Sequence, residues 1–197
     1  MNFKVIQEIT GVILAGGRSS RYGENKALLN LGGGTVISSV RDVLSSLFPR
    51  VILSANNPEE YKFLGLKTFT DFFEDKGPLG GIHSALVNSE TEKIFITTCD
   101  MPLIRAEDIL FIAQNSRESD ITVVSAGSRL QPLFGVYSKK LIPEIERILL
   151  DDKRKNYSVK RLLDVSDTKI LETSAPGIQF TNINKKEDYQ FIKSILK

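Results

Sequence analysis

Short apolar runs alternate along this chain with stretches in which hydrophobic residues recur every third or fourth position. An unbroken apolar run predicts a buried strand, and the three-to-four spacing predicts an amphipathic helix. The runs predict strands at residues 11–15, 51–54, 66–70, 94–98, 121–125 and 133–137, with shorter ones at 169–172 and 179–183. The periodic stretches predict helices at residues 36–47, 58–61, 82–87, 106–115, 141–149, 159–163 and 189–196.

This alternation of strands and helices predicts an α/β fold. We expect a three-layer α/β/α arrangement around a Rossmann-like, mostly parallel sheet, because strands joined by helices pair in parallel with helices on both faces. The less regular last third predicts an antiparallel element in that sheet. Nothing marks an internal boundary, so we expect one domain over residues 1–197, with residues 1–9 as a short leader.

Composition narrows the function without defining it. The chain has 197 residues and a net charge of +2, which is too mild for the concentrated basic face of a nucleic-acid-binding protein. It has one cysteine, Cys99, which suits a reducing compartment. No apolar stretch is long enough for a signal peptide or a membrane span. We therefore expect a cytoplasmic protein that binds neither nucleic acid nor membranes.

The stretch at residues 10–29, TGVILAGGRSSRYGENKALL, carries the clearest chemistry. A predicted strand runs into Gly16-Gly17, and Arg18, Arg21 and Lys26 follow. Glycines let backbone N–H groups approach a ligand, and cationic side chains pair with phosphate oxygens. The spacing is neither G-x-G-x-x-G nor G-x-x-x-x-G-K-[ST]. The stretch predicts a triphosphate-binding loop of another kind, with an ordinary turn carrying solvated basic residues as the alternative.

Asp100 is the second candidate, because it directly follows the buried strand predicted at residues 94–98. A carboxylate at the carboxyl end of a central strand lies at the crevice where open α/β sheets bind ligands. Mg²⁺ is held by one or two carboxylates together with substrate phosphates and water. Asp100 is therefore a candidate metal ligand, and a cap on the turn before Pro102 is the alternative.

The motif L-A-G-G-x-S-x-R-x-G-x-x-K at residues 14–26 resembles the signature of nucleotidyltransferases in the nucleotide-diphospho-sugar transferase-like superfamily. The double glycine after Leu14-Ala15 most resembles molybdenum cofactor guanylyltransferases of the MobA type. Tyr22 is a departure, since the family usually has Met there. The segment at residues 97–103, TTCDMPL, resembles the metal-bearing C-D-x-P segment of the same family.

The resemblance implies a set of nucleotide contacts. The residues expected to bind GTP are Leu14, Ala15, Gly16, Gly17, Lys26, Ser54, Asp71, Gly80 and Asp100. Lys26, Asp100 and Arg21 are expected to be catalytic, with Mg²⁺ on Asp100. Ser54 replaces a family Asn, so that contact is open. For Asp71, a solvated loop position is the alternative, and for Gly80 a plain helix-starting turn.

The resemblance also implies an acceptor site in the C-terminal part of the domain, with the nucleotide in the N-terminal half. Gln131 begins a segment similar to the family's [HQ]-P-L-x-x-[LV]-Y, and Asn182 and Asn184 lie in one similar to N-[IV]-N-T-P. Structural roles are equally consistent with both segments. The basic cluster around residues 153–161 could attract the acceptor's phosphate or form a solvated face.

The implied reaction is transfer of GMP from GTP to Mo-molybdopterin, with release of pyrophosphate. Other proteins of molybdenum cofactor biosynthesis and the oxidoreductases that receive the product are possible partners. A molybdopterin cytidylyltransferase or sugar-phosphate nucleotidyltransferase is the alternative enzyme, and a non-catalytic nucleotide-binding module is the alternative of another class. A catalytic triad or zinc site is disfavoured, because the one histidine, His83, is expected at the surface and Cys99 is expected to be a packed thiol.

Overall fold

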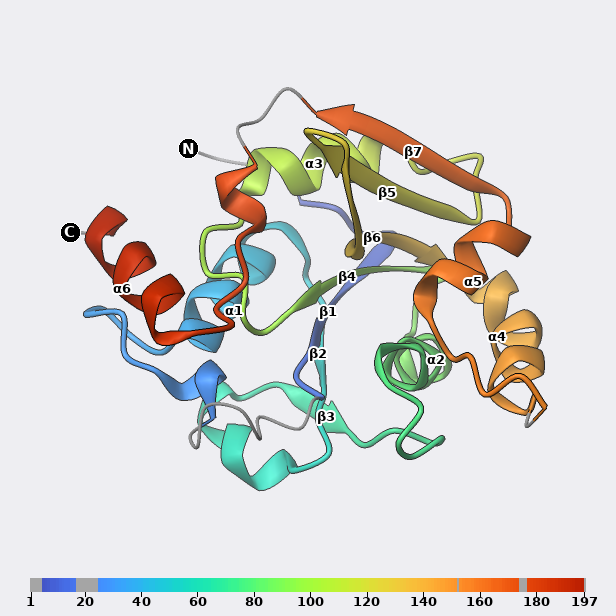
Figure 1. Cartoon of the computed structure of the whole chain (residues 1–197), viewed down its shortest axis with the longest axis horizontal. Helices are drawn as coiled ribbons and strands as arrows, with labels where there is room; N and C mark the ends of the chain where they lie inside the picture. The colour runs from blue at the N-terminus through green and yellow to red at the C-terminus, as the bar shows by residue number, and fades with distance from the viewer. Residues whose placement is uncertain (1–4, 17–24, 152, 174–176, 197) are drawn as a thin grey trace.

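The computed structural model describes residues 5–16, 25–151, 153–173 and 177–196, and the fold is given for these residues (Figure 1). The strands are β1 (Ile9–Leu14), β2 (Val51–Ser54), β3 (Lys67–Phe69), β4 (Lys93–Thr98), β5 (Ile121–Ala126), β6 (Arg129–Ser138) and β7 (Thr168–Thr173). The α-helices are α1 (Val36–Leu47), α2 (Pro78–Asn88), α3 (Ala106–Gln114), α4 (Ile142–Leu149), α5 (Val159–Val165) and α6 (Lys186–Ile195). Short 3-10 helices are η1 (Lys26–Leu28), η2 (Pro58–Leu64), η3 (Lys139–Leu141) and η4 (Ile178–Phe180).

The strands form one sheet in the order β3-β2-β1-β4-β6-β5-β7. β6 is antiparallel to both of its neighbours, and the other neighbouring pairs are parallel. The predicted mostly parallel sheet with an antiparallel element is therefore confirmed. Between β1 and β4 the order reverses direction, since β2 and β3 extend the sheet on one side of β1 and the later strands extend it on the other.

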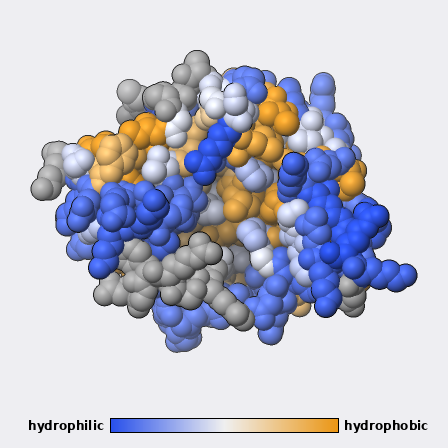
Figure 2. All heavy atoms as spheres, in the orientation of Figure 1, coloured by the Kyte–Doolittle hydropathy of each residue, from blue (hydrophilic) through white to orange (hydrophobic). Residues whose placement is uncertain are grey.

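Helices cover both faces of the sheet, which confirms the three-layer arrangement (Figure 1). Apolar residues of α1 and α3 pack on one face, in a core that includes Ile37, Leu44 and Ile109. Residues of α2, α4 and α5 pack on the other face, in a core that includes Ile82 and Ile145. Figure 2 shows hydrophobic residues in the middle of the same view and further ones toward its upper left, top and right side.

The sequence specifies several helix starts through local chemistry. Thr35 precedes α1 in an extended conformation, and its side chain accepts a hydrogen bond from the backbone N–H of Ser38 at 3.3 Å. Pro78 occupies the first position of α2, where its missing N–H costs nothing. Gly77 precedes it with φ at +63° and ψ at −158°, a conformation that glycine adopts without strain. α2 therefore begins four residues before the predicted start at residue 82.

The C-terminal segment folds back onto the N-terminal half. Ile183 and Ile192 form a small core with Val36 at the start of α1. Tyr189 on α6 donates its hydroxyl to the carbonyl of Asn30 at 2.5 Å. Together these contacts carry residues 181–184 to the edge of the sheet from which the loop after β1 emerges.

Other sequence predictions also differ from the structure. The strand predicted at residues 179–183 is wrong: η4 occupies part of it, and Phe180 and Ile183 are apolar there because they pack into two different cores. The segment expected to be a leader ends inside the sheet, since β1 begins at Ile9 and the backbone N–H of Ile6 bonds to the carbonyl of Leu47 at 2.8 Å.

We expect Gly135→Ala to lower the free energy of unfolding by about 1–3 kcal/mol, the usual range for overpacking. Gly135 lies on β6 beside a register shift between Val123 and Val124, and an added Cβ would approach the backbone oxygen of Thr122 and lie 2.8 Å from Val123 Cγ1. Urea unfolding measures the change. Gly33→Ala is the control, because an added Cβ there has no described heavy atom within 4 Å. Equal midpoints for the two variants would contradict the prediction.

Candidate active site

The carboxyl ends of β3, β2, β1 and β4 meet at one edge of the sheet (Figure 1). Backbone hydrogen bonds continue past the strand ends: Ala15 N–H donates to the Ser54 carbonyl at 2.8 Å, and Cys99 N–H donates to the Leu14 carbonyl at 3.1 Å. The segments that follow the strands therefore leave the sheet side by side. Open α/β sheets bind their ligands at this kind of edge, where the strand order reverses.

A cavity of about 1310 Å³ opens at this edge and gathers most of the predicted site residues. Those that line it are Leu14, Ala15, Gly16, Lys26, Ser54, Asp71, Asp100, Asn182 and Asn184. The predicted triphosphate lysine and the predicted metal carboxylate thus lie in one cavity, although they come from segments far apart in the sequence. The volume exceeds that of a typical small-molecule pocket, so two substrates can share it.

Asp100 follows β4 directly and is held by the protein through one carboxylate oxygen. Thr98 Oγ1 donates to Asp100 Oδ1 at 2.6 Å, and Asn182 Nδ2 donates to the same oxygen at 3.2 Å. Among the described residues none donates to Oδ2. The backbone carbonyl of Asp100 also accepts from Ile183 N–H at 3.0 Å.

Lys26 is positioned by the residue before it. Asn25 caps η1 through its side-chain oxygen, which accepts from Ala27 N–H at 3.1 Å. The Asn25 amide nitrogen donates to Glu60 at 2.6 Å and to the Tyr61 hydroxyl at 2.8 Å, both on η2. Lys26 itself donates from Nζ to the backbone carbonyl of Asn184 at 2.8 Å. The hydrogen bonds from Asn25 to η2 therefore fix the position of the chain directly before Lys26.

Asp71 follows β3 and is only partly exposed. Ser54 Oγ donates to Asp71 Oδ1 at 2.9 Å. Burial raises the pKa of Asp71 above its ordinary value, and the hydrogen bond from Ser54 offsets part of that rise. A Cβ added at Gly81 would lie 3.6 Å from Asp71 Oδ1, and one added at Gly16 would lie 3.9 Å from Oδ2. The glycines of two segments therefore leave space beside this carboxylate.

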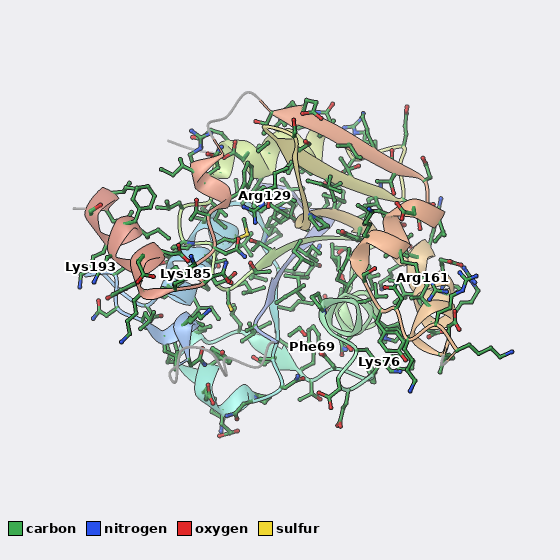
Figure 3. All side chains as sticks on the ribbon, in the orientation of Figure 1. Phe69, Lys76, Arg129, Arg161, Lys185 and Lys193 are labelled. Atoms are coloured by element: carbon green, nitrogen blue, oxygen red, sulfur yellow. The ribbon has the colours of Figure 1, made fainter. Side chains whose placement is uncertain are left out.

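A second cavity, of about 290 Å³, adjoins the first. Asn182 and Asn184 line both cavities, and Gln131 lines only the smaller one. Arg129 and Lys185, both labelled in Figure 3, contribute cationic side chains to its wall from different elements. The three predicted acceptor residues therefore share the walls of this second cavity.

Among the described residues, one predicted site residue lines neither cavity. Gly80 is buried in α2, and a Cβ there would lie 2.8 Å from the carbonyl oxygen of Phe73, whereas its neighbour Gly81 lines the main cavity. The predictions for Gly17 and Arg21 lie outside the described residues. Arg161 of the predicted basic cluster pairs with Asp151 at 2.6 Å on the α5 side of the molecule (Figure 3).

The sequence interpretation missed the hydrogen bonds around Asn25. An Asn directly before a short apolar segment is a recognised helix-capping signal, so its bond to Ala27 could have been predicted. Its bonds to Glu60 and Tyr61 could not, because they join segments that only the folded chain brings together. Tyr61 is buried, and this burial raises the pKa of its hydroxyl.

His83 is buried, so its predicted surface position is wrong. It is 4% exposed because α2 lies between the sheet and α4, and its ring packs edge-on against Phe73 with centroids 4.9 Å apart. Its Nε2 lies 3.1 Å from Glu146 Oε1.

Burial, and then the charge of Asp100, raise the pKa of the Cys99 thiol to about 12, which disfavours a nucleophilic role for Cys99.

The donor set fits a divalent cation that is shared with a phosphate ligand. The described residues contain no group of three or more His, Cys, Asp or Glu side chains that could hold a metal by themselves. Asp100 supplies one carboxylate, and its Oδ2 has no described protein donor. One carboxylate together with phosphate oxygens and water is a usual environment for Mg²⁺.

Comparison with known proteins agrees with this geometry. Residues 11–168 match the family described as the MobA-like NTP transferase domain. The chain belongs to this family. The MobA-like chain is therefore an enzyme of the nucleotidyltransferase type, and the resemblance stated from its motifs is confirmed.

Individual relatives extend the match over nearly the whole MobA-like chain. A probable molybdenum cofactor guanylyltransferase of Carboxydothermus hydrogenoformans is 36% identical over 193 residues, which cover 96% of this chain and 98% of that one. A putative protein of Aquifex aeolicus VF5 has a solved structure with a TM-score of 0.79 and 30% identity, covering 93% and 100% of the two chains. A Mycobacterium tuberculosis H37Rv protein solved in complex with manganese has a TM-score of 0.71 and 20% identity, covering 95% and 98%.

The described part of this MobA-like transferase contains no helix with the length and apolar character needed to span a bilayer.

We expect Asp71→Asn to stabilise the protein near neutral pH. Because the pKa of Asp71 is raised in the native state, ionising this carboxyl destabilises the native state relative to the unfolded chain. The amide removes that penalty. The gain in free energy of unfolding should be complete above the raised pKa and should disappear as the pH falls below the ordinary value of 3.8.

Urea unfolding of both proteins at about pH 7, 5 and 3 measures this difference, because these values lie on both sides of the ordinary pKa of an aspartate side chain. Asp164→Asn is the matched control, since Asp164 is exposed on α5. A gain for Asp71→Asn that is the same at every pH would contradict the assigned cause.

Proposed function

We propose that this protein transfers GMP from GTP to the terminal phosphate of Mo-molybdopterin, giving molybdopterin guanine dinucleotide and pyrophosphate. The observation that carries the proposal is the meeting of Lys26, Asp100 and the Asn182–Asn184 segment around one cavity. The relative from Carboxydothermus hydrogenoformans, a probable molybdenum cofactor guanylyltransferase, supports the choice of nucleotide and acceptor.

In the proposed step, a phosphate oxygen of molybdopterin attacks the α-phosphorus of GTP. The new P–O bond forms as the bond to the β-phosphate breaks, and the electron pair leaves with pyrophosphate. The attacking phosphate is already anionic at neutral pH, so the protein needs no general base. Positioning and charge neutralisation are then the main contributions of the protein to the rate.

Lys26 is the residue that we assign to the phosphates. A compact ammonium group is suited to the negative charge that grows on the leaving β-phosphate. Its bond to the Asn184 carbonyl holds it at the boundary between the nucleotide segments and the acceptor segment. Backbone N–H groups after β1 are the other proposed phosphate donors, because Ala15 and Gly16 line the same cavity.

Asp100 is the proposed ligand of Mg²⁺, which would neutralise phosphate charge between the two substrates when bound. Manganese in the Mycobacterium tuberculosis relative supports the use of a divalent cation. Asp71, Ser54 and Gly81 are proposed to contact the nucleoside, because they surround one part of the main cavity beside the start of α2.

The second cavity is the proposed site for the part of the acceptor that lies away from its phosphate. Gln131, Asn182 and Asn184 supply amide donors and acceptors of the kind that a pterin ring requires. We assign the reaction to the cytoplasm, because a single cysteine suits a reducing compartment. Other cofactor-biosynthesis proteins and the recipient oxidoreductases are the proposed partners.

A nucleotide panel tests the proposal. We expect GTP with Mg²⁺ and Mo-molybdopterin to release pyrophosphate, and ATP, CTP and UTP to give at most about one hundredth of that kcat/KM, since unpaired polar groups in a site reject a wrong base strongly. Pyrophosphate release and the dinucleotide product are measured together. A preference for CTP would replace guanylyl transfer by cytidylyl transfer, and GTP binding without transfer would favour a non-catalytic module.

Asp100→Ala and Lys26→Ala should each lower kcat by about 10²–10³-fold, the range found when a charge-stabilising group is removed. Lys62→Ala is the matched control, because Lys62 is exposed and pairs with Glu59 on η2. Steady-state pyrophosphate release measures all three variants. Undiminished turnover by Asp100→Ala would rule out the assigned metal role, and undiminished turnover by Lys26→Ala would rule out the assigned phosphate contact.

A further inference from the structure

The segment at residues 181–184 contacts both proposed catalytic residues of the nucleotide half. Asn182 Nδ2 donates to Asp100 Oδ1 at 3.2 Å, and Ile183 N–H donates to the Asp100 carbonyl at 3.0 Å. The carbonyl of Asn184 accepts from Lys26 Nζ at 2.8 Å. Three successive residues of what we expected to be an acceptor segment are therefore bonded to groups expected to bind GTP.

This segment is anchored on the side away from the cavity. Ile183 is fully buried against Val36 and Ile192. The carboxylate of Asp188, in the first turn of α6, accepts from the N–H groups of Asn184 and Lys185 at 2.8 Å each. Because a buried core and the first turn of α6 hold this segment, the backbone position of Asn182 is fixed.

The two side chains that donate hydrogen bonds to Asp100 come from different parts of the chain. Thr98 is the last residue of β4 and approaches Asp100 from its own strand, whereas Asn182 approaches from the C-terminal segment. Both donate to Oδ1, so two directions fix the orientation of one carboxylate oxygen. Among the described residues, both side-chain donors lie on Oδ1 and none lies on Oδ2.

We propose that Asn182 is a positioning residue for Asp100, and that its amide orients the carboxylate for the metal–triphosphate complex. This inference rests on the proposed function and changes one part of it, since the sequence resemblance implied only an acceptor contact for Asn182. Hydrogen-bonding partners of metal ligands orient those ligands, and their loss usually costs about 10–100-fold in metal affinity or activity. The acceptor segment then also completes the nucleotide site.

The experiment measures GTP binding by calorimetry without acceptor, once with Mn²⁺ and once with EDTA. The ratio of the two affinities gives the gain that the metal contributes, without any turnover. We expect Asn182→Ala to reduce this gain about tenfold or more and to leave GTP affinity in EDTA within about twofold. Thr98→Val, which removes the other donor, should reduce the gain in the same direction.

Asn184→Ala is the contrasting variant, because Asn184 lies in the same segment and bonds to Lys26 through its backbone carbonyl. For this variant, the ratio of GTP affinity with Mn²⁺ to GTP affinity in EDTA should remain within about twofold of the wild-type ratio. A loss equal to that of Asn182→Ala would show a general disturbance of the segment and would overturn the proposal. Thermal unfolding of each variant establishes that the fold is retained.

A double-variant cycle tests whether Asn182 acts through Asp100. In an Asp100→Ala background, Asn182→Ala should change the metal-dependent gain by less than about twofold, because the carboxylate that it orients is gone. A further loss of about tenfold there would show that Asn182 acts on its own and would overturn the proposal.

The proposed function fails separately from this inference. If Mn²⁺ strengthens GTP binding but no GMP reaches molybdopterin, the acceptor assignment is wrong, whereas the role of Asn182 is still decided by the calorimetric ratio. If Asn182→Ala leaves that ratio unchanged and only raises KM for molybdopterin, Asn182 is an acceptor contact and the positioning role is wrong.

Discussion

The parallel pairing of β1 with β4 is the constraint on which the rest of the site depends. Its register places Leu14 opposite Thr98, and the Cys99 N–H extends the ladder to the Leu14 carbonyl at 3.1 Å. The segment that follows β1, where the phosphates are proposed to bind, and the segment that carries Asp100 therefore leave the sheet at the same level. Because β2 and β3 continue the sheet on the other side of β1, the strand order reverses at this pair and leaves a crevice above it.

A second, longer-range constraint completes the site. Lys26 and the Asn184 carbonyl that it contacts are 158 positions apart in the sequence, and Asn182 is 82 positions from Asp100. The small core around Ile183 brings these groups together, so packing of α6 against the start of α1 determines their geometry. The segments proposed to bind the nucleotide follow neighbouring strands of the sheet. The C-terminal part of the chain reaches the same cavity because it packs against the start of α1.

Elements that follow from local sequence patterns were predicted correctly from the sequence. Predictions failed where the burial of a residue depends on segments that are distant in the sequence. The buried strand before Asp100 and the helix at residues 36–47 both follow from short-range signals, and both are confirmed. His83 was placed at the surface because nothing near it in the sequence predicts that α4 will cover α2. Residues 179–183 were predicted as a strand because an apolar pattern cannot tell a sheet contact from packing into two separate cores.

Asp71 and Asp100 are two of the carboxylates that line the main cavity, and their surroundings differ. Asp71 receives a hydroxyl donor from Ser54, and burial raises the pKa of its carboxyl group. Asp100 receives two donors on one oxygen, and in the proposed function its carboxylate holds the cation. In the proposed function, these different surroundings give two identical side chains different tasks, as in many enzymes that use paired carboxyl groups. The Asn182 bond then ties the cation side of the cavity to the segment that approaches the acceptor.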